Sequence, residues 1–162
     1  ILAQAIGSAG PPPPARGAMK GCMGLDDWDS PVFEQRDGAS LHASVPAHRW
    51  CVQYRDLQQF RGIVLRAVQR GAIASTEDEE VLPSDEELGP SMAAVTKQLI
   101  VPITKKHGSA SWALMLHPEG SDCELFVTHS WKEGVFEFLD KVMCSWPTGV
   151  HNAYCCMLSN PQ

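Results

Sequence analysis

The sequence has no long hydrophobic run: nowhere in its 162 residues do apolar residues approach the ~18 in succession that a membrane-spanning helix needs. A Gly-rich phosphate loop is also missing, since neither GxGxxG nor a P-loop pattern occurs. The opening stretch lacks the basic n-region of a secretory signal. We therefore expect no membrane contact within this segment and a cytoplasmic location.

A disulfide framework and a local metal site are missing too, although six cysteines are present. Their spacing is not that of a disulfide scaffold, no pair is CxxC, and no stretch supplies four zinc ligands. Cys155 and Cys156 are adjacent in an apolar run, where a strand would point them to opposite faces. We expect buried, reduced thiols and no metal; a zinc or redox module is the alternative.

The sequence also lacks an excess of positive charge, because it has nineteen acids and thirteen Lys and Arg, for a net charge of −6. Seven of those acids lie in residues 77–87, so the rest of the chain holds twelve acids against thirteen bases. Such a near-neutral body has no field that would hold a phosphate backbone, and we expect no nucleic-acid partner. The acidic run itself is expected to be an exposed loop.

Hydrophobic residues make up 44% of the chain, enough for one globular domain or for a small domain with a tail. Residues 1–50 are rich in Pro and Gly and include the run Pro11–Pro14. We expect a disordered N-terminal tail or linker there, with Trp28 and Phe33 as candidates for docking.

Residues 51–120 are expected to form a helical region that includes the acidic loop at 77–87. Apolar residues at helical spacing predict an amphipathic helix over 54–70, which Gly71 ends. A second helix is expected over 90–106, with Pro90 at its first position and a kink or an end at Pro102.

Residues 121–162 carry the clearest pattern. They predict a strand over 123–129, a helix over 131–145 and a second strand over 153–158. Ser130 and Glu133 have the spacing of a capping box for that helix. The connection length fits a right-handed crossover between parallel strands, a βαβ unit.

The predicted fold class is therefore α/β: an incomplete parallel sheet at the C-terminus, preceded by helices and the tail. A parallel sheet needs cover on both faces, which we assign to helix 131–145 on one face and to helices 54–70 and 90–106 on the other. We expect the chain to end within the sheet and, because a strand pair leaves an open edge, to be marginally stable.

Ligands of open α/β sheets bind beyond the carboxyl ends of the strands. Both strand ends carry candidate binding residues: Thr128, His129, Ser130, Trp131, Ser159 and Asn160. The amino end of helix 131–145 would favour an anion or phosphate at the same place. Two alternatives stay open for His129, a ligand-binding residue or a strand-end histidine held by a backbone carbonyl. Capping alone explains Ser130, and packing in the core explains Trp131.

The remaining histidines have simpler explanations. His117 and His151 fall in turns and are expected to be solvated, and His107 suits the end of a helix. No catalytic residue can be assigned from the sequence.

The segment LFVTHSW at 125–131, followed by KEGVFEFLD, resembles the first strand and helix of Toll/interleukin-receptor (TIR)-like domains. The second strand, AYCCMLSNPQ at 153–162, resembles the pattern FxSHxW…WxDxxCxPQ of a divergent TIR-like branch. With SWALMLHPEG upstream, the chain is also similar to segments of large dinoflagellate-type algal proteins.

The resemblance implies a flavodoxin-like parallel sheet of which this chain holds the first βαβ unit. It implies an intracellular signalling or scaffold protein with protein partners and self-association through the TIR-like domain, and no cofactor. Because some TIR domains cleave NAD, the alternative is a nucleotide-handling enzyme of the NAD glycohydrolase type. The glutamate that those members use would lie beyond Gln162.

Overall fold

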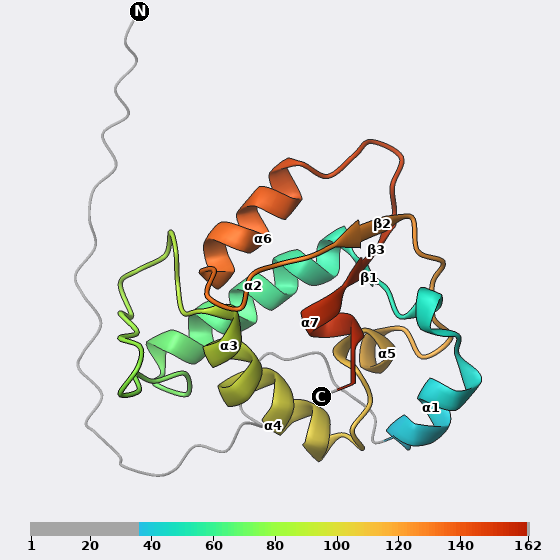
Figure 1. Ribbon diagram of the computed structural model, residues 1–162, viewed down its shortest axis with the longest axis horizontal. Coiled ribbons are helices and arrows are strands. Elements are labelled where there is room, and N and C mark those ends of the chain that lie inside the picture. Colours follow the sequence, from blue (N-terminus) through green and yellow to red (C-terminus); the bar gives the residue numbers. More distant parts are fainter. Residues whose placement is uncertain (1–35, 162) are drawn as a thin grey trace, which may run out of the picture.

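The computed structural model describes residues 36–161 (Figure 1). Most of the expected tail, with Trp28 and Phe33, lies outside these residues. Residues 36–50 were also assigned to the tail, but they form helix α1 (Gly38–Ser44) and a 3₁₀ helix (Ala47–Arg49). Tertiary contacts hold this segment, since the Gly38 N–H donates to the Gly108 carbonyl at 2.9 Å.

The first long helix, α2 (Tyr54–Gln69), begins where expected and ends one residue before the expected end at 70. A capping box between Gln53 and Asp56 starts it, and Gly71, with φ of +75°, follows its end. Its apolar stripe is buried, including Leu57, Phe60, Ile63, Val64, Ala67 and Val68. The stripe faces the core because apolar residues three and four apart share one side of a helix.

The second helical run begins at α3 (Met92–Val95), continues through a π-helical turn (Thr96–Ile100) and ends in α4 (Val101–Lys106). Ser91 caps it, rather than Pro90 occupying its first position. The helix was expected to kink or end at Pro102, and it does not end there. The wider π turn comes immediately before α4, so Pro102 lies in the first turn of α4, where its missing N–H is tolerated.

The short helix α5 (Trp112–Leu116) and three strands complete the framework: β1 (Val52–Gln53), β2 (Leu125–Val127) and β3 (Asn152–Cys155). The strand order is β1-β3-β2. β2 and β3 are parallel and are joined through α6 (Val135–Cys144), while β1 pairs antiparallel with β3. The chain is an α/β protein whose small sheet is mixed, because the unforeseen β1 occupies one of its edges.

Both element boundaries expected near the candidate site are displaced. The helix predicted from residue 131 begins at Val135, because residues before it pair with the start of α3: the Met92 N–H donates to the Glu133 carbonyl at 3.0 Å. Ser130 and Glu133 therefore do not cap α6; Gly134 is the N-cap residue. The strand predicted through Leu158 ends at Cys155 and gives way to helix α7 (Cys156–Ser159).

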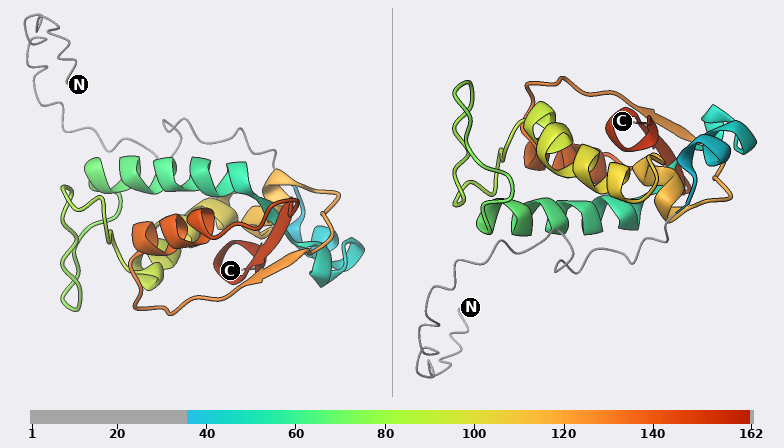
Figure 2. Two further views of the ribbon diagram at one scale, coloured as in Figure 1. Left: turned by 90° about the horizontal axis from the view of Figure 1, so that it is seen from above. Right: turned by 90° about the horizontal axis from the view of Figure 1, so that it is seen from below.

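The sheet has one covered face and one open face. Val52, Ala153 and Cys155 are buried on the inner face, against the helices. On the outer face, Phe126 is 64% exposed. In both views of Figure 2, β2 lies at the margin of the molecule, on the side away from α2. The expected cover of both faces by helices is thus wrong for the described residues: their helices leave Phe126 uncovered.

Candidate functional site

The carboxyl ends of the parallel strands β2 and β3 bring an imidazole and a thiol together. His129 lies two residues after β2, and Cys156 directly follows β3. The Nδ1 atom of His129 is 3.0 Å from the Sγ atom of Cys156. The two residues are 27 positions apart in sequence, so the contact depends on the parallel pairing of the strands. We call these two residues the thiol–imidazole pair.

Aromatic rings surround His129. The ring of Trp131 stands edge-on to the imidazole at 4.7 Å between centroids, and that of Phe138 at 5.7 Å. The Nε2 atom is buried and has no hydrogen-bond partner among the described residues. Burial lowers the pKa of His129 below its ordinary value, and the charge of Glu133 acts weakly in the opposite direction. The imidazole is therefore neutral at pH 7.

Burial raises the pKa of the Cys156 thiol, because desolvation disfavours the thiolate. Backbone N–H groups of Cys156, Met157 and His129 lower the pKa of this thiol and so act in the opposite direction. At neutral pH the thiol–imidazole pair is consequently uncharged. The neighbouring Cys155 is buried on the inner face, where its pKa is raised to about 12.

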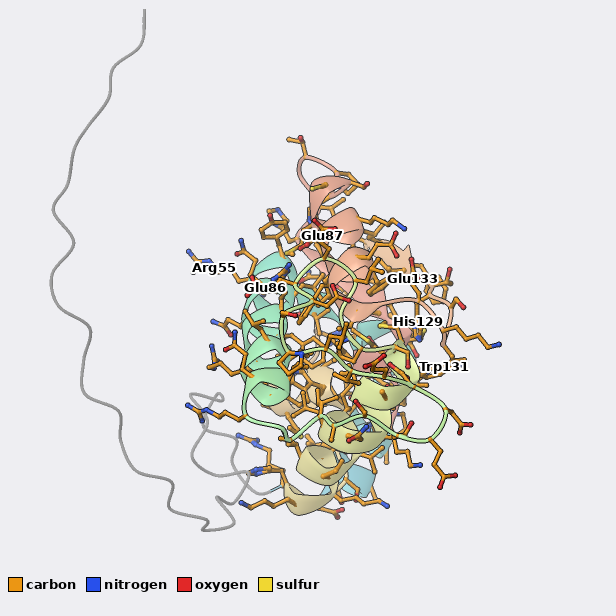
Figure 3. The ribbon with its side chains drawn as sticks, turned by 90° about the vertical axis from the view of Figure 1, so that its left-hand side faces the viewer. Arg55, Glu86, Glu87, His129, Trp131 and Glu133 are labelled. Atoms are coloured by element: carbon orange, nitrogen blue, oxygen red, sulfur yellow. The ribbon has the colours of Figure 1, made fainter. Side chains whose placement is uncertain are left out.

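Among the six residues expected to form a binding site, His129 and Trp131 have rings in contact. Trp131 is 52% exposed, so its expected role in the core is wrong. Thr128 is exposed beside His129, and Ser130 accepts a 3.4 Å hydrogen bond from the Lys132 N–H within the turn. Figure 3 shows His129, Trp131 and Glu133 together, on the side of the molecule away from Arg55 of α2.

The residues after β3 serve the fold instead. Ser159 is buried, and its hydroxyl accepts a hydrogen bond from the Cys155 N–H at 2.9 Å. The side chain of Asn160 accepts a hydrogen bond from the Tyr154 hydroxyl.

The anion site expected at the amino end of the helix after β2 is also not formed. The first N–H groups of α6 are already used: Val135 donates to the Pro90 carbonyl at 2.9 Å and Phe136 to the Leu88 carbonyl at 3.0 Å. Donors that are bonded within the protein are not available to a phosphate.

Cys156 was the functional candidate missed by sequence reasoning, which treated it as a strand residue. His129 was selected because it lies just beyond the carboxyl end of a strand. The same criterion selects Cys156, because β3 ends at Cys155. The signal was therefore in the sequence, but it depended on a strand boundary.

An acidic groove of about 960 Å³ adjoins the turn before α6. Trp131 contributes to its lining, which includes the acids Asp78, Glu79, Glu80, Asp85, Glu133 and Glu137. The Glu79 side chain is fixed in position, because its carboxylate accepts hydrogen bonds of 2.6 Å from both the N–H and the hydroxyl of Ser91. The negative lining disfavours a pyrophosphate in this groove.

The outer face of the sheet carries a second candidate surface. The rings of Phe126 on β2 and Tyr154 on β3 are stacked, with centroids 5.3 Å apart and planes 12° apart. These two residues are partners in the parallel register. We call this stacked pair the aromatic face; it lies beside the free edge of β2.

His117 is partly buried and bonded to Asp56 rather than fully solvated. Its Nε2 atom lies 2.7 Å from the Asp56 carboxylate, which also accepts a 2.6 Å hydrogen bond from the Gln53 N–H at the start of α2. The contact joins residues 61 positions apart and anchors the end of α5 to α2.

Within residues 36–161, no three His, Cys, Asp or Glu side chains converge as a metal site would require. The helices of this part of the chain are all too short or too polar to cross a bilayer. Comparison with known proteins gives no match among family models, curated proteins or solved structures.

Proposed function

We propose that this chain carries the first βαβ unit of a TIR-like domain and acts in an intracellular signalling scaffold through protein contacts. The observation that supports this proposal best is the aromatic face, which Phe126 and Tyr154 present on an uncovered side of the sheet. Exposed aromatic side chains of this kind are enriched where proteins bind one another. A second copy of the chain is the partner favoured by the resemblance.

The sheet topology supports the same proposal. In a flavodoxin-like sheet the first strand lies inside, between the second and the third. Here β2 would be that first strand and β3 the second, with β1 on the far side of β3. The free edge of β2 is then the place where a further parallel strand would pair.

NAD cleavage, the alternative that follows from the same resemblance, has less support. The side chain of Asn160 is engaged by Tyr154, and the first N–H groups of α6 are bonded to loop carbonyls. The groove next to Trp131 is lined by acids, which would repel a dinucleotide. NAD turnover by the full chain that is lost on H129A would restore this alternative.

Self-association of the full 162-residue chain tests the proposal. Sedimentation velocity over a range of concentrations should show association by the wild type, weakened at least ~10-fold by F126S, because burying one aromatic ring contributes ~1.5–3 kcal/mol. L82S is the matched control, since Leu82 is also exposed, at 51%, but lies in the acidic loop. A monomer at every concentration, or equal effects of F126S and L82S, would contradict the proposal.

A further inference from the structure

We propose that the thiol–imidazole pair is a nucleophilic site at which Cys156 accepts acyl groups from esters or thioesters, with His129 as the general base. The proposal stands on the 3.0 Å contact between Sγ and Nδ1 at the carboxyl ends of two parallel strands. It is independent of the aromatic face, which lies on Phe126 and Tyr154.

The geometry suits a nucleophile. Cys156 lies at a strand-to-helix turn, between β3 and α7, so its side chain leaves the sheet at an edge rather than in the core. It is half-buried, whereas Cys155 is fully buried. A positioned base within hydrogen-bond distance is what a thiol needs to react while it is still protonated.

The surroundings of the pair also suit an acyl transfer. Backbone N–H groups of Cys156, Met157 and His129 lower the pKa of the thiol against the larger effect of burial, and so favour the negative charge that develops on the sulfur as the proton leaves. Trp131 and Phe138 hold the imidazole from two sides. Because the imidazole is neutral at pH 7, it can take a proton.

The reaction can be written with its protons and electrons balanced. The Cys156 thiol gives its proton to Nδ1 of His129 while the sulfur forms a bond to the carbonyl carbon of the ester or thioester. The bond from that carbon to the alkoxide or thiolate leaving group then breaks, and the imidazolium returns the proton to the leaving group. Water hydrolyses the resulting thioester on Cys156, with His129 as base, and restores the thiol.

The full chain incubated with p-nitrophenyl acetate tests this site. Release of nitrophenolate gives the rate, and peptide mass spectrometry gives the acetylated residue. We expect acetylation of Cys156 at pH 7 at least ~10-fold faster than that of Cys144, an exposed cysteine at the end of α6. C156S should remove this fast phase, and H129Q should slow it to the rate of Cys144.

Two control variants separate a chemical role of His129 from a structural one. H117Q removes the contact of the partly buried His117 with Asp56 and should leave acetylation of Cys156 unchanged, as should F126S. Circular dichroism should show that H129Q remains folded. Acetylation of Cys156 no faster than that of Cys144, or unchanged in a folded H129Q, would overturn the proposal; an H129Q that unfolds is replaced by H129N in the same assay.

Discussion

Phe60 and Phe126 form aromatic pairs of nearly equal separation in opposite surroundings. Phe60 is fully buried, and its ring meets that of Trp112 at 5.2 Å between centroids, in the core between α2 and α5. Phe126 meets Tyr154 at 5.3 Å but remains 64% exposed on the sheet. The Phe60–Trp112 contact therefore stabilises the core between the helices. The Phe126–Tyr154 contact remains exposed on the outer face of the sheet, where another protein could bind it.

Two histidines repeat the contrast. His117 on the helical side contacts Asp56, a carboxylate that also caps α2, so every group in the contact serves the fold. His129 at the sheet edge contacts Cys156, and its second nitrogen has no partner among the described residues. We assign a function to His129 because not all of its polar atoms are bonded within the described residues.

The largest expected effect separates the two aromatic pairs. F60A should lower the free energy of unfolding by about 3–5 kcal/mol, because it leaves a cavity in a closed core. F126A removes an exposed ring and should lower it by less than about 1 kcal/mol. Urea unfolding of both variants measures the difference; similar losses would show that the outer face is part of the stabilising core.

A smaller effect is expected in the pH dependence of stability, and it comes from His129. The pKa of His129 is lower in the folded protein than in the unfolded chain. As the pH falls from about 6.5 towards the lowered value, the folded protein therefore binds fewer protons than the unfolded chain does. The free energy of unfolding of the wild type should decrease in that window, as the unfolded state is favoured by protonation. The contribution is fully present above about pH 6.5.

The variant H129Q isolates this contribution, because it removes the titrating group and keeps a polar side chain. Its free energy of unfolding should fall less steeply than that of the wild type when urea unfolding is repeated at intervals below pH 7. An equal slope in the two proteins would mean that His129 is not protected from protonation by the fold.

Sequence patterns were sufficient where a regular period extends over many residues. The stripe through Leu57, Phe60 and Val64 predicted α2 to within one residue at its end. The alternation of strand, helix and strand in 121–162 predicted the parallel pairing of β2 with β3. The spacing of apolar residues and the lengths of these segments predict the elements without knowledge of tertiary contacts.

Features set by tertiary contacts were not predictable in the same way. Ser130 and Glu133 have the spacing of a capping box, but pairing of the segment before α6 with the start of α3 moves the helix start to Val135. β1 has only two residues, Val52 and Gln53, which are too few to show an alternating pattern in the sequence. It forms because it can pair with the edge of β3. The contact of His129 with Cys156 required the end of β3 to be placed correctly.

The pH profile of Cys156 acetylation tests the central claim most directly: the sheet edge, unlike the helical side, holds a histidine that is free to do chemistry. Between about pH 7 and 8.5 the rate in the wild type should be nearly constant, because neutral His129 takes the proton over that whole range. In H129Q the rate should rise about tenfold per pH unit with the thiolate fraction. The same rising slope in both proteins would contradict the account.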